Sequence, residues 1–229
     1  MRQDEYYQMN ISPITETTGA LININIEDTA GFLAKLPTYI GHDYCPTPNE
    51  LLIENGIIDG RIYKITTIEE TAFSHCRNLK ILRIGKSVEI IKWNMYKCVS
   101  LTDIIVDKEN PNYYDIDGVL FKEKELIAFP QGRTGTYIVP DGIEKIGKHA
   151  FKSCNLSSIV FPETLHEIGI NAFYECNKIK EFILPKSIKK IHSNSNVGTK
   201  PFIQKFYLSS DVVKSNPLSI SEVTKMFPT

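Results

Sequence analysis

The chain of 229 residues lacks the features that mark several large classes of protein. Its five cysteines, at positions 45, 76, 98, 154 and 176, are an odd number and too sparse for a disulfide scaffold. Neither sign of charge dominates, since 26 lysines and arginines face 27 aspartates and glutamates, which argues against a nucleic-acid partner. No apolar run approaches the roughly 20 residues of a bilayer span, and the first residues lack the apolar segment of a signal peptide. We therefore expect a soluble chain without a membrane span.

A repeated phrase with a period of about 22 residues occupies the middle of the chain. It consists of an isoleucine, then an Ala-Phe pair and then a cysteine, and its clearest copies are Ile146, Ala150-Phe151, Cys154 and Ile168, Ala172-Phe173, Cys176. Looser copies are Ile68, Ala72-Phe73, Cys76 and Ile91, Met95-Tyr96, Cys98. A second phrase, Leu-x-x-Ile-x-Leu, follows each of these four cysteines and ends at Ile84, Val106, Phe161 and Leu184. A degenerate last copy, without a cysteine before it, ends at Leu208.

The two phrases fit the geometry of a leucine-rich repeat. The Leu-x-x-Ile-x-Leu phrase predicts a short strand whose alternate side chains point inward. The Ala-Phe phrase predicts the return path, a turn or short helix, in which the alanine allows close packing and the phenylalanine fills the space behind the strand. A single repeat cannot bury its own apolar side, so the repeats must stack on one another.

These phrases resemble the BspA-type (Treponema-type) leucine-rich repeat family, closely over residues 137–191 and more loosely over 64–106. The resemblance implies an α/β solenoid, a right-handed superhelix of short parallel strands joined by short helices or turns. We expect a β-rich N-terminal cap over residues 1–63, repeats over 64–192 and a last repeat with a C-terminal cap over 193–229. The stretch 107–137 resembles an insertion common in the family.

Inside the insertion, two apolar segments flank a charged tetrapeptide and predict a hairpin. Its arms are Val119–Phe121 and Leu126–Phe129. Because Phe129 lies 23 residues after Val106, we expect the second arm to join the row of Leu-x-x-Ile-x-Leu strands. Asp115 and Asp117 are typical turn residues.

Four of the cysteines occupy one equivalent position per repeat: Cys76, Cys98, Cys154 and Cys176. Stacked equivalent positions aim their Cβ atoms in parallel, whereas a disulfide needs them to converge. We therefore expect buried free thiols, while Cys45 stays unexplained. The histidines, carboxylates and glycines form no recognisable nucleophile, metal or phosphate motif. The sequence predicts a protein that is not an enzyme and has no cofactor and no metal.

The residue before the last apolar position of each strand phrase must point outward, because side chains alternate along a strand. From the second repeat onward this outward row is apolar, which predicts an interaction site on the concave face. The alternative is that β-branched residues simply stack well in a sheet. The row is Arg83, Ile105, Ala128, Ile138, Val160, Ile183 and Tyr207, and the candidate ligand-binding residues are Arg83, Ile105, Ile138, Val160, Ile183 and Tyr207.

The family resemblance implies a cell-surface or secreted protein, since members are typically cell-surface or secreted proteins of host-associated bacteria and some protists, and several are implicated in adhesion. We expect a non-enzymatic module that binds a protein or glycan ligand through the concave sheet. The alternative is a structural role, as a spacer or oligomerising segment of a cell-surface assembly.

Overall fold

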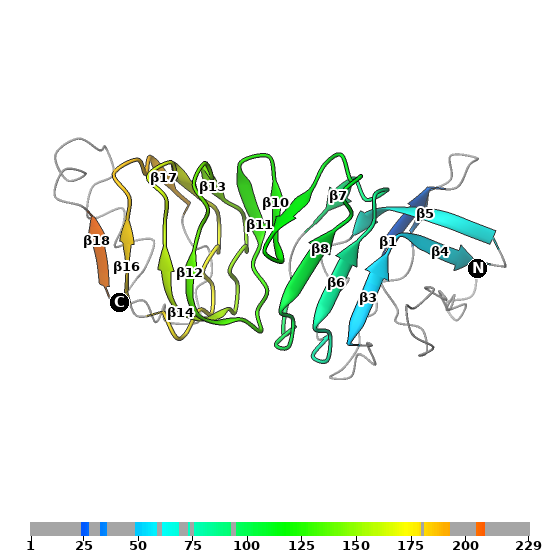
Figure 1. Ribbon diagram of the computed structural model, residues 1–229, viewed down its shortest axis with the longest axis horizontal. Coiled ribbons are helices and arrows are strands. Elements are labelled where there is room, and N and C mark those ends of the chain that lie inside the picture. Colours follow the sequence, from blue (N-terminus) through cyan, green and yellow to red (C-terminus); the bar gives the residue numbers. More distant parts are fainter. Residues whose placement is uncertain are drawn as a thin grey trace. The chain divides into compact units, whose positions relative to one another are not determined.

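The computed structural model describes residues 24–27, 33–35, 49–58, 61–68, 73, 76–92, 95–179, 181–192 and 205–208. At 24–27, 33–35, 55–58, 61–64, 181–182 and 205–208 only the backbone is described. The chain divides into two compact units, residues 1–120 and 121–229. Each unit stacks short parallel strands as successive rungs, where a rung is one repeat of the solenoid (Figure 1). The proposed boundaries of caps and repeats stay a prediction.

In unit 1 the Leu-x-x-Ile-x-Leu phrases form parallel strands, which we call front strands. They are β3 (Glu50–Ile53), β6 (Ile81–Ile84) and β8 (Asp103–Val106). Leu82 lies in register with Leu51 on one side and with Ile104 on the other, and all three are buried. Alternate residues face outward, so the predicted alternation of the strand phrases is confirmed.

A second sheet of unit 1 combines antiparallel and parallel strands. Strand β5 (Arg61–Ile68) pairs antiparallel with β1 (Ile24–Glu27) and β4 (Asn55–Ile58), and β1 pairs with β2 (Leu33–Lys35). The end of β5 also pairs in parallel with β7 (Ile90–Ile91), the strand that precedes the next aromatic phrase.

The insertion begins with a hairpin of β9 (Tyr114–Ile116) and β10 (Val119–Lys122). Asp117 and Gly118 form its turn with φ angles of 48° and 67°, the backbone that an Asp-Gly hairpin turn favours. Asp117 is a turn residue as predicted, but Asp115 is not, because it lies inside β9. Asp115 Oδ1 accepts a hydrogen bond of 2.8 Å from Val106 N, and the carbonyl oxygen of Gly118 accepts one of 2.8 Å from Ile104 N. The hairpin thus covers an edge of β8 that would otherwise be open.

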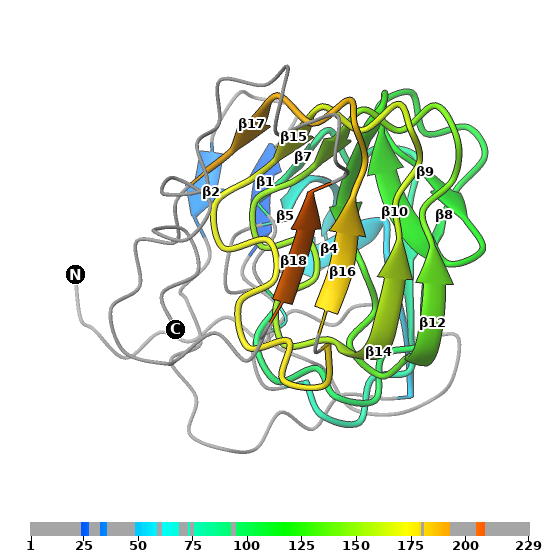
Figure 2. The same cartoon turned by 90° about the vertical axis from the view of Figure 1, so that its left-hand side faces the viewer.

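Unit 2 has a row of front strands and a second row of strands that pair in parallel with one another, which we call back strands. The front strands β12 (Thr134–Ile138), β14 (Asn155–Val160), β16 (Glu181–Leu184) and β18 (Lys205–Leu208) lie side by side (Figure 2). The back strands are β11 (Glu125–Ala128), β13 (Lys145–Ile146), β15 (Glu167–Ile168) and β17 (Lys190–Ile191).

Within the described ranges the chain forms strands, turns and bends without a helix, so the expected α/β class with short helices is wrong. The architecture is a parallel β-solenoid. The return paths show the physical reason: His149, Ser153, Asn171 and Glu175 all have positive φ angles between 53° and 60°. A left-handed residue at every fourth position prevents a continuous α-helix.

The placement of the second hairpin arm was also predicted wrongly. Strand β11 pairs with back strand β13 and not with a front strand, so Ala128 is fully buried and does not belong to the outward row. Ala128-Phe129 is a copy of the Ala-Phe phrase, 22 residues before Ala150-Phe151. The backbone N–H of Phe129 accordingly donates to the carbonyl of Ala150, as that of Phe151 donates to Ala172.

The phenylalanines of the Ala-Phe phrases form a continuous stack through the core of unit 2. The ring of Phe151 lies 5.0 Å from that of Phe129 and 5.2 Å from that of Phe173, with both pairs close to parallel. Phe151 is fully buried, as the Ala-Phe phrase predicts. Since the stack runs through consecutive rungs, the ring of Phe151 contributes to the core of the rung before it and of the rung after it.

We expect Phe151→Ala to lower the free energy of unfolding by about 3–5 kcal/mol, because it removes a buried ring and leaves a cavity between two others. Phe151→Leu keeps more of the volume and should cost less. Ile170→Ala, at an exposed position, is the control. Chemical denaturation measures all three, and an unchanged midpoint for Phe151→Ala would contradict the role of the stack.

Charged side chains alternate in sign along the back strands of unit 2. Lys145 Nζ lies 3.2 Å from Glu125 Oε2 and 4.0 Å from Glu167 Oε1, and the ring Nε2 of His192 lies 2.9 Å from the same Glu167 oxygen. Burial alone would raise the pKa of Glu167, but the hydrogen bond from His192 and the charges of Lys145 and Lys190 outweigh it and lower this pKa. The ionised form of Glu167 therefore stabilises the stack.

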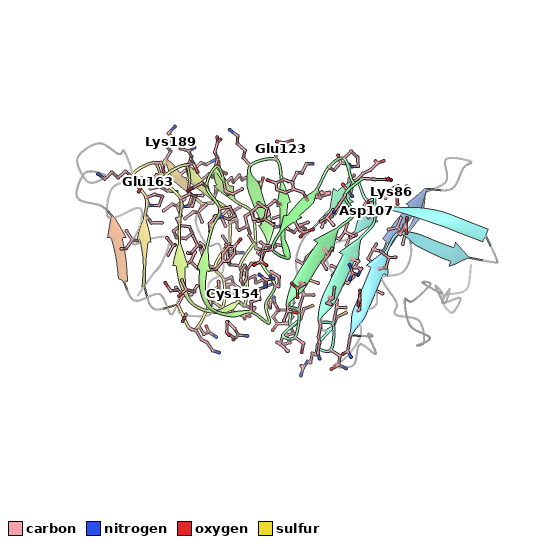
Figure 3. The ribbon with its side chains drawn as sticks, viewed as in Figure 1. Lys86, Asp107, Glu123, Cys154, Glu163 and Lys189 are labelled. Carbon is pink, nitrogen blue, oxygen red and sulfur yellow. The ribbon has the colours of Figure 1, made fainter. Side chains whose placement is uncertain are left out.

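Because the pKa of Glu167 is lower in the folded chain, its stabilising effect is present above its ordinary pKa and is lost as the pH falls through the lowered value. We expect Glu167→Gln to lower the free energy of unfolding by up to about 1 kcal/mol near pH 7 and by less near pH 3. Denaturation at both pH values measures the difference. Glu163→Gln, at an exposed carboxylate (Figure 3), is the control; a Glu167→Gln effect that does not depend on pH would refute the assignment.

Candidate functional site

The candidate surface is the outward side of the front strands, and in unit 2 it is apolar. Ile138 of β12 lies in register with Val160 of β14, and Ile183 of β16 with Tyr207 of β18. The exposed fractions of Ile138, Val160 and Ile183 are 68%, 48% and 66%. In contrast, their strand neighbours Val139, Ile159 and Leu184 are buried. The outward orientation predicted for these three residues is confirmed, whereas the side chain of Tyr207 lies outside the described residues.

The outward positions of β12 and β14 beside these residues carry small uncharged side chains, whereas the positions two residues before Ile183 and Tyr207 are Glu181 and Lys205. Thr136 of β12 lies in register with Ser158 of β14, two residues before Ile138 and Val160. Thr134 and Thr136 are exposed and Ser158 is half-buried. The described part of β12 and β14 therefore presents hydroxyl groups beside an aliphatic row, and no ionisable side chain. We call Ile138, Val160 and Ile183 the aliphatic row.

In unit 1 the equivalent positions are less exposed and partly charged. Arg83 of β6 lies between Leu52 of β3 and Ile105 of β8, and all three are half-buried. The guanidinium of Arg83 forms an ion pair with the carboxylate of Glu50, which faces outward from β3 as Leu52 does. This pair satisfies the charge of Arg83 within the protein. Arg83 and Ile105 thus face outward as predicted, but they do not present the free apolar surface that unit 2 has.

One strand of this face, β3 of unit 1, differs from the sequence-based prediction. Glu50–Ile53 was assigned to the N-terminal cap, although it pairs with β6 as a front strand of unit 1. A signal for it exists, because Leu51-x-Ile53 repeats the Leu82-x-Ile84 end of the next strand phrase. Without this strand neither the partner of Arg83 nor the outward position of Leu52 could be identified.

The cysteines and His149, whose side chains could in principle react or bind a metal ion, are part of the core or the turns. Cys76, Cys98, Cys154 and Cys176 are buried free thiols, as predicted, and Cys45 lies outside the described residues. His149 contacts Asn171 at 3.4 Å, between Nε2 and Nδ2. No cluster of three histidine, cysteine or acidic side chains suited to a metal ion occurs among the described residues. Nor does that part of the chain contain a helix of the length and apolarity of a membrane crossing.

Comparison with protein families identifies the repeats. The family described as "BspA type Leucine rich repeat region (6 copies)" matches residues 61–139 and 127–220. Among curated proteins no match was found.

Several solved structures are similar to this chain. A leucine-rich repeat protein from Eubacterium ventriosum is 27% identical, with 56% of this chain and 37% of that chain covered and a TM-score of 0.48. The pneumococcal vaccine antigen PcpA is 24% identical, with 56% and 38% covered and a TM-score of 0.47. A leucine-rich cell surface protein from Faecalibacterium prausnitzii is 19% identical, with 79% and 62% covered and a TM-score of 0.46.

The matched region of this chain thus corresponds to between 37% and 62% of the lengths of these three proteins. The family match extends over more than half of the chain and includes the back strands, the Ala-Phe phrases and every front strand described above except β3. The chain belongs to the BspA-type leucine-rich repeat family.

Proposed function

We propose that this chain is a non-enzymatic interaction module that binds a protein ligand on the front strands of unit 2. The observation that carries the proposal is the aliphatic row: three aliphatic side chains on neighbouring strands are half to two-thirds exposed, although the strands that hold them are otherwise well packed. Exposure of a row of large aliphatic side chains to water is unfavourable, and a partner that covers the row removes this cost. A rigid sheet also positions such a row at little cost in conformational entropy on binding.

The chemistry of the row favours a protein over a charged polysaccharide. Isoleucine and valine side chains offer apolar contact area, and the neighbouring threonine and serine hydroxyls can donate and accept hydrogen bonds. The described side chains of β12 and β14 provide no cation for sulfate or uronate groups. An apolar centre with a polar, hydrogen-bonding rim is the common pattern of a protein–protein interface.

A surface location with a role in adhesion is the biological setting that we propose for this module. One of the similar structures is named a cell surface protein, and the family resemblance points in the same direction. In that setting the partner would be a protein of a host surface or of the extracellular matrix. A spacer or oligomerising segment is the alternative, in which a second copy of this chain covers the row.

The first test is binding of the full chain to immobilised collagen, fibronectin, laminin and fibrinogen, measured by surface plasmon resonance. We expect at least one of the four to bind, and the combined change Ile138→Lys, Val160→Lys and Ile183→Lys to weaken this binding about tenfold or more, because three charges replace the apolar contact. Circular dichroism should stay unchanged. A second variant with threonine at the three positions keeps β-branched side chains and avoids repulsion between neighbouring lysines.

Matched controls are Val99→Lys and Ile170→Lys, which place the same charge at exposed apolar residues outside the row. We expect both to bind as the unchanged chain does. Binding that survives the lysine and threonine variants would reject the row as the site. If none of the four proteins binds and sedimentation velocity shows an oligomer that the threonine variant dissociates, the structural alternative is correct.

A further inference from the structure

Two cysteines of unit 2 lie in contact across consecutive rungs. The Sγ atoms of Cys154 and Cys176 are 3.3 Å apart, and both side chains are almost completely buried. They occupy the same place in their repeats, three residues after the phenylalanine of the Ala-Phe pair (Cys154 is labelled in Figure 3). Both are free thiols in this structure.

The contact differs from what simple stacking predicts. Parallel Cβ vectors on neighbouring strands would keep two sulfur atoms about one strand spacing, ~4.8 Å, apart. The observed separation is shorter, so the two side chains converge. Convergence of this kind is the geometric requirement for a disulfide between neighbouring strands. We propose that Cys154 and Cys176 are an oxidisable pair that forms a disulfide between two consecutive rungs of unit 2.

The two thiols have different environments in the folded chain. Cys176 Sγ lies 2.8 Å from the carbonyl oxygen of Phe151, to which its S–H donates. Burial raises the pKa of Cys176 well above its ordinary value. When Cys154 is ionised, the S–H of Cys176 can instead donate to it, and this hydrogen bond lowers the pKa of Cys154. In the folded chain Cys154 is therefore the more readily ionised of the two thiols.

The reaction is a thiol–disulfide exchange with a small disulfide such as glutathione disulfide as oxidant. During folding, the thiolate of one of the two cysteines attacks one sulfur of the oxidant, which forms a mixed disulfide and releases one glutathione thiolate. As the two rungs come together, the other cysteine loses its proton and attacks the protein sulfur of the mixed disulfide, which releases the second glutathione. Two protein thiols are oxidised by two electrons in total, and one glutathione disulfide is reduced to two glutathione molecules.

The link would fasten the strands that carry the aliphatic row. Cys154 directly precedes β14, which holds Val160, and Cys176 lies five residues before the start of β16, which holds Ile183. A disulfide here closes a loop that contains back strand β15 and Phe173. It would fix one rung to the next independently of their hydrogen bonds, mainly by restricting the unfolded chain.

The test folds the full chain in the presence of the oxidant, because the thiols are accessible before they are buried. The unfolded, reduced chain is refolded in a glutathione–glutathione disulfide buffer, unfolded again with iodoacetamide and digested with trypsin. No lysine or arginine occurs between Ser153 and Asn177, so a single tryptic peptide, 153–178, contains both cysteines and none of the other three. We expect most of this peptide to carry no alkyl group and to be two hydrogen atoms lighter than the reduced form.

Cys154→Ser and Cys176→Ser are matched controls that leave one thiol in the same peptide. We expect this thiol to be alkylated or to carry glutathione, and the oxidised unchanged chain to melt several degrees above its reduced form, with no such difference in either variant. The proposal is wrong if peptide 153–178 carries two alkyl groups after oxidative refolding. A mixed disulfide with glutathione at Cys154 that does not resolve, or a preferred link of either cysteine to another one, would equally overturn it.

Discussion

Hydrogen bonding from one rung to the next is the constraint on which the rest of the structure depends. In unit 2 the backbone N–H of Gly147 donates to the carbonyl of Leu126, and that of Gly169 donates to the carbonyl of Ile146, each at 2.8 Å. At this spacing the two rungs leave no room for a side chain. A Cβ atom on Gly169 would lie 2.8 Å from the backbone of Gly147, which explains why glycine occurs at both positions. The regular period of about 22 residues follows, because each rung must present its donors opposite the acceptors of its neighbour.

The same constraint accounts for the left-handed residues on the return paths. His149 and Asn171 precede the alanines of two consecutive rungs, and Ser153 and Glu175 precede the cysteines; all four have positive φ angles. Glycine would avoid the strain that such a backbone imposes on other residues. However, the four side chains interact in pairs across the rungs: Ser153 Oγ donates to Glu175 Oε2 at 2.8 Å, and Asn171 contacts His149. These contacts between rungs offset part of the strain, and they are unavailable to glycine.

The repeats could be predicted from the sequence because their apolar residues recur at fixed intervals, and so could the outward positions of Ile138, Val160 and Ile183, since alternation along a strand is a local property. The back strands could not, because two residues such as Lys145–Ile146 show no periodicity and become a strand only through pairing with the next rung. The distance of 23 residues from Val106 predicts a strand end at Phe129, although Ala128-Phe129 keeps the 22-residue phase of the Ala-Phe phrases. The ion pair of Arg83 could not be predicted, because its partner Glu50 lies on β3, a strand distant in sequence within the segment expected to form the cap.

The two sides of unit 2 differ in what they leave unsatisfied, and this difference points to the front strands as the binding side. Along the back strands, Lys145 lies between Glu125 and Glu167, so charges of opposite sign compensate one another within the protein. A partner that approached this side would have to replace interactions that already exist. On the front strands the aliphatic row faces solvent, and a partner that covered Ile138, Val160 and Ile183 would lower the free energy by burying apolar surface. The parallel stacking that buries the inner side chains of the front strands also holds the outer ones in a row, so the surface that we propose for binding is a direct consequence of the repeat.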